Sequence, residues 1–265
     1  MIKKIISKLK SKNFSVCIVG LGYVGLPLCL RFLNKGFKVT GIDKDLNKIK
    51  KLKNFESYIS SVRPKEIRKA FSLNFKITNN FKFISKSDVI IVCVPTPIKP
   101  NKVPEMKHIS DTAEKLTKYI KKEQILILES TVYPGVTRKI KQLILGKSLK
   151  VGQDIFIGYS PEREDPGNKN FTTKTIPKVV SGYTQNCLCI TSAIYDAIVD
   201  ITVPVSSTRV AEMTKILENI HRAVNIGLVN ELKIVADKMD IDIYEVINAA
   251  STKPFGFTPF YPGPG

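Results

Sequence analysis

The chain has 265 residues, 43% of them hydrophobic, which is enough to bury the core of one large domain or two small ones. Its formal net charge of +19 raises nucleic acids and acidic membrane surfaces as partners. The charge comes mainly from lysines spread along the chain, and no aromatic-interleaved basic motif accompanies them, so we expect no nucleic-acid binding.

The N-terminal segment 1–13 is a basic leader without the apolar stretch or cleavage site of a signal peptide. No apolar run reaches the ~20 residues that span a bilayer, so no membrane span is expected. Five cysteines show neither a disulfide framework nor a convincing metal-binding spacing: Cys17, Cys29, Cys93, Cys187 and Cys189. We therefore expect reduced thiols, no metal and a cytoplasmic protein.

Short apolar runs alternate with helical patterns over most of the chain. Strands are expected at the continuous apolar runs 14–20, 37–43, 88–94, 125–128, 154–159 and 179–181. Helices are expected over 23–35 and 108–121 and around Cys187. This alternation predicts an α/β fold, a Rossmann-type doubly wound and mostly parallel sheet with helices on both faces.

The pattern changes near residue 206. Residues 209–239 contain no proline and place apolar residues at i, i+3, i+4 and i+7, which predicts a helix of roughly thirty residues. A second helical pattern covers 241–250, and a loop rich in glycine, proline and aromatic residues follows. We therefore expect one domain over 14–205 and part of a second, helical domain over 206–265.

A glycine pattern directly follows the first expected strand. Gly20, Gly22 and Gly25 fit G-x-G-x-x-G between a strand and a helix. The first glycine permits a tight turn, the second lets the backbone approach a pyrophosphate, and the third lets the helix pack closely. The turn residues Tyr23 and Val24 are assigned to the same site, where the helix N-terminus favours phosphate.

An acidic residue, Asp43, ends the next expected strand. Its carboxylate would accept hydrogen bonds from ribose hydroxyls and repel a 2′-phosphate, so the pattern predicts NAD as cofactor in preference to NADP. The nearby Lys44 and Lys48 reduce that preference slightly.

Six motifs in this order resemble the UDP-glucose/GDP-mannose dehydrogenase family. They are GLGYVGLPL (20–28), VPTP (94–97), ESTVYPG (129–135), YSPEREDPGN (159–168), VAEMTKILENIHRAVNIGLVNEL (210–232) and KPFGFTPFYPGPG (253–265). The fourth motif and the final loop are most similar to the UDP-N-acetylglucosamine 6-dehydrogenase branch. Pro166 stands where UDP-glucose relatives carry a second glutamate, which also favours the N-acetylated branch.

The resemblance implies an enzyme that oxidises a sugar C6 alcohol to a carboxylate with two NAD. It implies that Lys215 and Asn219, four residues apart on one face of the long helix, stabilise an oxyanion at the sugar carbon. By the same resemblance Thr131 holds a water or the reacting oxygen, and Glu162 is the base for hydrolysis of a thioester.

Further contacts rest on the same resemblance. Pro95 and Thr96 would line the nicotinamide side, as would Thr131, and Lys48 would contact the adenosine ribose. Substrate contacts are implied for Glu162, Lys215 and Asn219 and also for three further residues: Arg163, Phe260 and Tyr261.

In the family, the final loop continues into a segment with a nucleophilic cysteine and then into a UDP-binding domain, and this sequence contains neither. The expected function is therefore a nucleotide-sugar 6-dehydrogenase in truncated or split form, unable to complete both oxidations alone. Its expected partners are a UDP-sugar, a second copy bound through the long helix as a homodimer, and a separate C-terminal half. Two alternatives stay open: a β-hydroxyacid dehydrogenase, which shares a similar front half, and an inactive NAD-binding or dimerising remnant.

Overall fold

The computed structural model describes residues 1–145, 149–163 and 174–264. They form two compact units, 1–213 and 214–265. Helix α8 (Thr208–Lys238) begins in the first unit and ends in the second, and the domain boundary expected near 206 stays a prediction. Over the described ranges, no helix combines the length and apolar character needed to cross a membrane.

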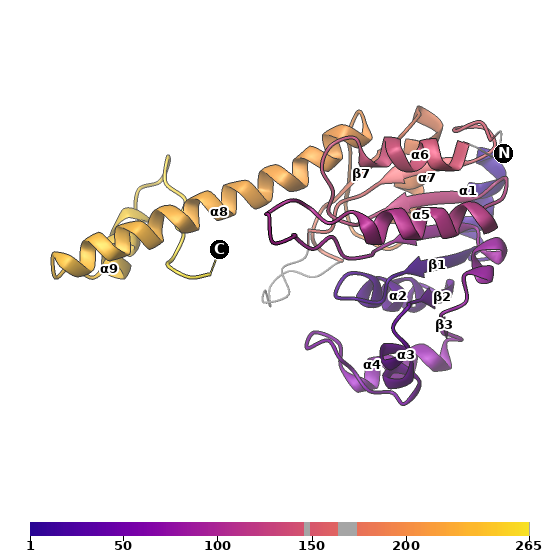
Figure 1. Ribbon diagram of the computed structural model, residues 1–265, viewed down its shortest axis with the longest axis horizontal. Coiled ribbons are helices and arrows are strands. Elements are labelled where there is room, and N and C mark those ends of the chain that lie inside the picture. Colours follow the sequence, from indigo (N-terminus) through magenta and orange to yellow (C-terminus); the bar gives the residue numbers. More distant parts are fainter. Residues whose placement is uncertain (146–148, 164–173, 265) are drawn as a thin grey trace. The chain divides into compact units, whose positions relative to one another are not determined.

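An eight-stranded sheet, counted over the described residues, forms the centre of the first unit (Figure 1). The strand order is β3-β2-β1-β4-β5-β6-β7-β8, and neighbouring strands are parallel except for β6 and β7. The strands are β1 (Ser15–Val19), β2 (Lys38–Ile42), β3 (Lys76–Thr78), β4 (Val89–Val92), β5 (Ile125–Leu128), β6 (Phe156–Tyr159), β7 (Lys178–Gly182) and β8 (Thr202–Pro204). This order and direction confirm the predicted doubly wound, mostly parallel sheet.

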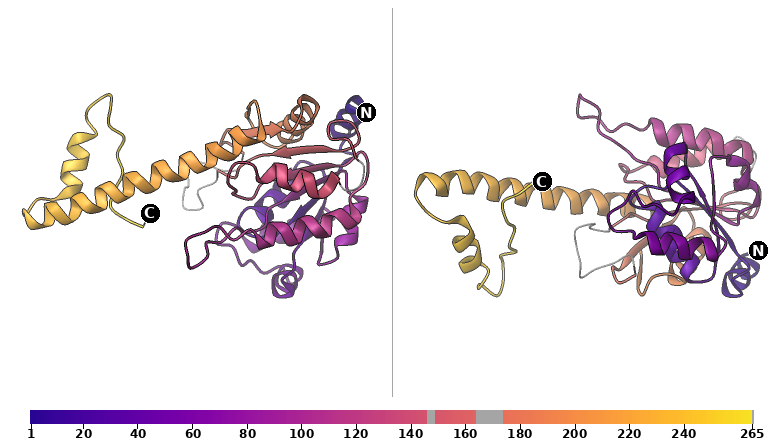
Figure 2. Two further views of the ribbon diagram at one scale, coloured as in Figure 1. Left: turned by 45° about the horizontal axis from the view of Figure 1, so that its top comes forward. Right: turned by 90° about the horizontal axis from the view of Figure 1, so that it is seen from below.

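Helices cover both faces of the sheet (Figure 2). Because successive strand side chains point to opposite faces, Val16 and Ile18 join one core while Cys17 and Val19 join the other. One face carries α1 (Ile2–Lys10), α2 (Gly25–Asn34), α3 (Leu46–Lys53), α4 (Pro64–Ser72) and α7 (Gln185–Asp196). The other carries η1 (Phe81–Lys86), α5 (Lys107–Tyr119) and α6 (Val136–Leu145).

Several short helices and strands are not predicted by the pattern of apolar residues. The structure adds α3, α4, α6, η1, β3 and β8 to the expected set. Strands β3 and β8 have three residues each, too few to show an alternation. Helix α3 is lysine-rich and buries only Ile49 and Leu52, so its apolar signal is thin.

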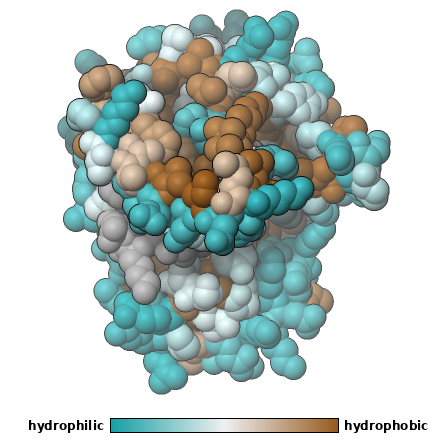
Figure 3. All heavy atoms as spheres, turned by 90° about the vertical axis from the view of Figure 1, so that its left-hand side faces the viewer, coloured by the Kyte–Doolittle hydropathy of each residue, from teal (hydrophilic) through white to brown (hydrophobic). Residues whose placement is uncertain are grey.

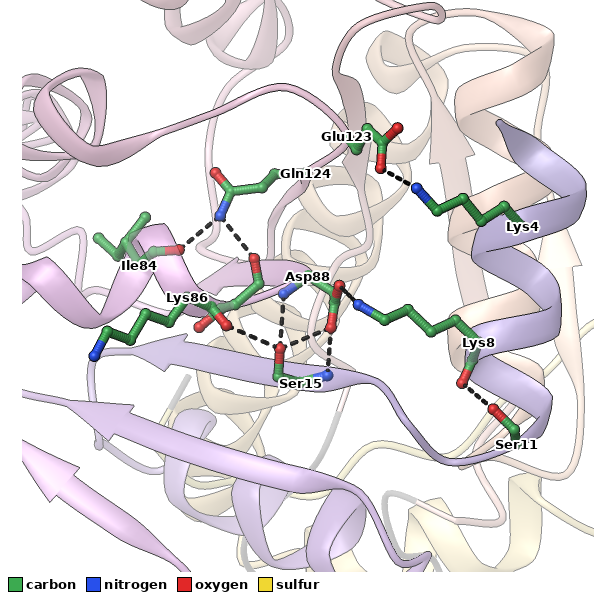
Figure 4. A network of polar contacts seen from close by, with 10 residues as sticks. Lys4, Lys8, Ser11, Ser15, Ile84, Lys86, Asp88, Glu123 and Gln124 are labelled. Atoms are coloured by element: carbon green, nitrogen blue, oxygen red, sulfur yellow. Dashed lines mark hydrogen bonds and ion pairs between the residues drawn. The ribbon is translucent and has the colours of Figure 1, made fainter.

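The amino-terminal edge of the sheet is closed by hydrogen bonds (Figure 4). The Asp88 carboxylate accepts from the backbone N–H of Ser15 at 2.8 Å and from its hydroxyl at 2.7 Å, and it pairs with Lys8 of α1. The Gln124 amide donates to the carbonyls of Ile84 and Ser87 at 2.6 and 2.7 Å. Burial raises the pKa of Asp88, but bonds from Lys8 and Ser15 outweigh it, so this pKa lies below its usual range.

The leader expected over 1–13 contains a helix that belongs to the first unit's core. Ile5 and Leu9 of α1 are buried against the sheet's helical layer, whereas its lysines face outward or form ion pairs. An amphipathic pattern therefore explains both the basic composition and the packing of this segment.

The second unit consists of the later turns of α8, helix α9 (Ile243–Ala250) and the final loop. Val229 and Ala236 of α8 bury themselves against Ile243 and Ile247 of α9. The Asn230 amide donates to the Gly263 carbonyl and accepts from the Gly263 N–H, each at 2.9 Å. These two bonds join the final loop to α8.

An apolar stripe on α8 is left uncovered. Figure 3 shows exposed hydrophobic surface among polar side chains on the face turned to the viewer. In the second unit, seven of the exposed apolar residues recur three or four positions apart, six on one side of α8 and one directly after its last residue. They are Leu217, Ile220, Val224, Leu228, Leu232, Val235 and Met239.

The first turn of α8 is fixed within the first unit. The fully buried carboxylate of Glu212 accepts from the backbone N–H groups of Gly135 and Thr137, at 2.6 and 2.9 Å. These donors lie at the start of α6, where backbone N–H groups lack partners within the helix. Glu212 thus caps α6 from a different element.

Candidate active site

A cleft of about 550 Å³ opens in the first unit, at the edge where the parallel strands end. Its walls come from the segments that follow β1, β2, β4, β5 and β6 and from one side of α5. Ligands of open α/β sheets bind at this edge, at the point where the order of the strands changes direction. Here that point lies between β1 and β4, because β2 and β3 follow on one side and β5 and β6 on the other. Ten residues predicted for the site line it: Gly20, Gly22, Tyr23, Val24, Asp43, Lys48, Pro95, Thr96, Thr131 and Glu162.

The glycine turn has the geometry that a pyrophosphate needs. Gly20 has φ +96°, and a side-chain carbon there would lie 2.6 Å from the carbonyl oxygen of Cys93. A side-chain carbon at Gly25 would lie 1.8 Å from the carbonyl oxygen of Gly20, so α2 packs against the turn itself. A side-chain carbon added at Gly22 would meet no atom within 4 Å beyond its chain neighbours, which leaves open space for a ligand. Gly25 starts α2 rather than lining the cleft, and the helix N-terminus favours phosphate.

Asp43 is the acidic group at the β2 side of the cleft. Its buried carboxylate accepts backbone N–H groups from Leu21 and Asp45, at 2.8 and 2.9 Å, which fixes its orientation. Lys48 lies 3.6 Å away as an ion-pair partner, and the Tyr58 hydroxyl donates to the Leu21 carbonyl at 2.6 Å. This end therefore offers an oriented carboxylate to ribose hydroxyls.

The loops after β4 and β5 are joined by side-chain hydroxyls. Thr96 donates to the Thr131 carbonyl at 2.8 Å, and Ser130 donates to the Val94 carbonyl at 2.7 Å. The Thr131 side chain itself is exposed to the cleft. Two adjacent loops are thus held together at the far end from Asp43.

A buried ion cluster lies at this far end. The Lys178 ammonium pairs with the Glu129 carboxylate and donates to Glu162 Oε2 at 3.1 Å. Glu129 and Lys178 are almost entirely buried, and the Cys93 thiol donates to Glu129 Oε2 at 3.4 Å. Glu162 also accepts from the backbone N–H of Arg163 at 2.8 Å. The neighbouring Arg163 is not among the residues lining the cleft.

The protonation of the cluster follows from burial and charge. Burial lowers the pKa of Lys178, but Glu129 and Glu162 outweigh it, so the pKa of this ammonium lies above its usual value. Burial raises the pKa of Glu129, and Lys178 opposes that shift. Burial and the Glu129 charge raise the pKa of Cys93 well above its ordinary value. Cys93 is therefore a neutral thiol at neutral pH.

Sequence patterns missed Glu129 and Lys178. Glu129 is the first residue of the ESTVYPG motif and directly follows β5. A charged residue at the end of a parallel strand indicates a position at the ligand-binding edge of the sheet. Lys178 is the first residue of β7, and β7 runs antiparallel to β6. Because β7 runs in the opposite direction, its first residue lies at the edge where the parallel strands end. No pattern in the sequence predicts this direction.

The other predicted site residues lie in the second unit. Lys215 and Asn219 lie one turn apart on α8, and Asn219 Oδ1 accepts from Arg222 at 2.9 Å. The rings of Phe260 and His221 are 5.5 Å apart, edge to face. These two units are described separately, so roles for Lys215 and Asn219 at the cleft stay predictions.

Tyr261 lies in the final loop of the same unit. Its hydroxyl donates to Asn248 Oδ1 at 2.9 Å, and its ring stacks on Tyr244 at 6.4 Å. Its role in substrate binding, like that of Phe260, stays a prediction.

Comparison with known proteins defines the class. Residues 14–199 match the NAD binding domain of the UDP-glucose/GDP-mannose dehydrogenase family, and residues 209–265 match the central domain of that family. The chain belongs to this family, which confirms the resemblance seen in the sequence. NAD is accordingly the cofactor, and the glycine turn, Asp43 and the open space at Gly22 fit it.

Individual relatives narrow the comparison. The chain is 42% identical to Protein CapL of Staphylococcus aureus, over 95% of this chain and 59% of that protein. It is 40% identical to UDP-N-acetyl-D-glucosamine 6-dehydrogenase of Pseudomonas aeruginosa, over 95% of this chain and 60% of that protein. The structure of the UDP-N-acetyl-mannosamine dehydrogenase Cap5O of S. aureus superposes with a TM-score of 0.84 at 29% identity, covering 95% of this chain and 61% of that one. The chain thus spans about three fifths of the length of these relatives.

Proposed function

We propose that this chain provides the NAD-binding and central parts of a nucleotide-sugar 6-dehydrogenase that oxidises the C6 alcohol of UDP-N-acetylglucosamine to a carboxylate with two NAD. The observation that carries the proposal is a single cleft with a dinucleotide turn and Asp43 at one end and Thr131 and Glu162 at the other. The 40% identity to a UDP-N-acetyl-D-glucosamine 6-dehydrogenase supports the choice of sugar.

The roles of the polar residues follow from their chemistry. NAD, held by the glycine turn and Asp43, would supply the hydride acceptor for the sugar carbon. In this proposal Glu162, which Lys178 contacts at the cleft, takes a proton from water, and Thr131 positions that water. On α8, the Lys215 ammonium and the Asn219 amide can stabilise an oxyanion at the sugar carbon.

A thiolate for the second oxidation has no source among the five cysteines. Cys17, Cys29, Cys93 and Cys187 are buried, and burial raises the pKa of the first three. Cys189 is exposed but lies on α7, outside the cleft lining. We therefore propose that the nucleophile and the UDP-binding part come from a segment other than these 265 residues. Five free thiols and the need for NAD favour the cytoplasm.

The apolar stripe on α8 supports pairing with a second copy of the chain. Leu217, Val224 and Leu232 are exposed by 61, 63 and 46%, and an uncovered stripe of this kind is a contact surface. Two-fold pairing is the commonest solution for such a helix. Light scattering at micromolar concentration should show a dimer, and a uniform monomer would contradict this part of the proposal.

Two alternatives receive less support. A β-hydroxyacid dehydrogenase would share the glycine turn and a helix lysine, but not the Glu162 motif or the Tyr261 loop. An inactive remnant would have no need for the ion cluster that holds Glu162 at the cleft.

Titration calorimetry tests the cofactor site first. The chain should bind NAD more tightly than NADP, and Asp43→Asn should narrow that difference. Equal binding of both by the parent would contradict the assignment of Asp43.

Complementation tests the reaction. Added to a C-terminal segment of a relative that bears the cysteine, the chain should form two NADH per UDP-N-acetylglucosamine, and Lys215→Ala should abolish this. Two NADH per sugar from the chain alone would show that the nucleophile lies within it.

A further inference from the structure

The glycine turn after β1 is held by side chains that bond to both sides of one residue, Leu21. Its backbone N–H donates to Asp43 Oδ2 at 2.8 Å, and its carbonyl accepts from the Tyr58 hydroxyl at 2.6 Å. The Leu21 side chain is fully buried, and a side-chain carbon at Gly41 would lie 2.8 Å from one of its methyl carbons. Leu21 is therefore fixed through its side chain and through both of its backbone polar groups.

The Tyr58 hydroxyl fixes a peptide group that faces the cleft. The Leu21 carbonyl and the Gly22 N–H belong to one planar trans peptide, so they point in opposite directions. Gly22 lines the cleft, whereas Tyr58 is not among the lining residues. Within the part of the chain that the structure describes, the Gly22 N–H has no hydrogen-bond acceptor. Tyr58 thus holds this peptide from behind and leaves its N–H to a ligand in the cleft.

The surroundings of Tyr58 keep its hydroxyl a donor. The Lys48 ammonium lies 5.7 Å from the centroid of the Tyr58 ring and 3.6 Å from Asp43 Oδ2, so it contacts both side chains that hold Leu21. Burial, followed by the Asp43 charge, raises the pKa of Tyr58 above its ordinary value. The hydroxyl therefore keeps its proton at neutral pH.

We propose that Tyr58 is a positioning residue for the pyrophosphate of NAD, acting through the peptide group between Leu21 and Gly22 rather than by contact with the cofactor. The pyrophosphate of a dinucleotide lies on this type of glycine turn, where backbone N–H groups bond to phosphate oxygens. An N–H that already points at the ligand needs no ordering on binding, and such ordering would weaken affinity. The inference rests on the NAD site and adds to it a residue outside the glycine motif.

Tyr58→Phe tests the proposal, because it removes the hydroxyl and keeps the ring beside Lys48. NADH binding to the full 265-residue chain is followed by NADH fluorescence, with ADP and adenosine as competitors. NADH and ADP carry a pyrophosphate, and adenosine does not. We expect the dissociation constants of NADH and ADP to rise about three- to tenfold, as for one lost hydrogen bond, and that of adenosine to stay as in the parent.

Tyr183→Phe is the matched control. Tyr183 is half-buried like Tyr58, and its hydroxyl accepts from the Lys141 ammonium at 2.7 Å. It directly follows β7, which runs antiparallel to β6 and therefore ends at the edge of the sheet opposite the cleft. Loss of this hydroxyl should leave the dissociation constants of all three ligands unchanged.

The three ligands separate the inference from the NAD site itself. Weaker binding of NADH and ADP with unchanged binding of adenosine supports positioning of the pyrophosphate turn by Tyr58. An equal loss for all three ligands overturns the inference, because it indicates an effect on the adenosine side or on the whole fold. Unchanged NADH binding also overturns it and leaves the NAD site intact. A folded parent that binds neither NADH nor ADP overturns the NAD site and the inference with it.

Discussion

The two edges of the sheet in the first unit use buried polar groups in opposite ways. At the amino-terminal edge, the Asp88 carboxylate accepts from Ser15 and Lys8, and the Gln124 amide donates to two backbone carbonyls, which closes the strand ends. At the carboxyl-terminal edge, Glu129, Lys178 and Glu162 bond to one another beside an open cleft. The first network joins strand ends, whereas the second also brings charged groups to the lining of the cleft.

The largest expected effect comes from breaking the cleft-side cluster. Lys178→Met removes the ammonium that pairs with the fully buried Glu129 carboxylate, which should lower the free energy of unfolding by about 3–5 kcal/mol. Urea denaturation followed by circular dichroism measures it.

Lys4→Met is the control for that variant. Lys4 pairs with Glu123 at 2.8 Å, but both side chains are well exposed, so we expect no measurable change in stability. Equal losses in the two variants would contradict the distinction between a buried cluster and a surface pair.

A smaller effect is expected at the opposite edge. Asp88→Asn weakens the bonds to Ser15 and Lys8 and should lower the free energy of unfolding by about 1–2 kcal/mol at neutral pH. NAD affinity should stay that of the parent. A loss of binding without a loss of stability would reverse the roles given to the two edges.

The pH dependence of Asp88→Asn provides a second check. The pKa of Asp88 is lowered by folding, so its contribution is present above the ordinary pKa and is lost as the pH falls through the lower folded value. The difference between parent and variant should therefore shrink below about pH 4. A difference that grows on acidification would contradict the assignment.

The smallest effect on stability is expected at Gly22, where an added side-chain carbon meets open space. Gly22→Ala should unfold within about 0.5 kcal/mol of the parent. Because the same carbon occupies the approach of the pyrophosphate, NAD affinity should fall about tenfold or more. Gly25→Ala, which meets the Gly20 carbonyl, should instead lose stability as well.

The sequence predicts well what is contiguous. The turn from Gly20 to Gly25 and the acidic end of β2 lie in one continuous stretch of chain. Their spacing in the sequence therefore predicts the dinucleotide site. The motif predicts Glu162, which lines the cleft, but no motif predicts its partner Lys178, because that pairing depends on the direction of β7.

Short or polar helices and strands are harder to predict from the sequence because they have few buried apolar positions. Helix α4 begins with Pro64 and has a capping arrangement between Arg63 and Glu66, yet only Ile67 and Ala70 are buried. With so few apolar positions, periodicity gives little signal, and tertiary contacts decide.

Glu212 makes the start of α8 observable from another part of the chain. Its carboxylate holds the amide hydrogens of Gly135 and Thr137, so they are protected only while the first turn of α8 stays docked. In hydrogen–deuterium exchange the two amides should open together, at the rate at which that turn detaches. Their exchange rates therefore measure local opening of this turn. Glu212→Gln should raise the exchange rates of both amides without altering those of the central strands.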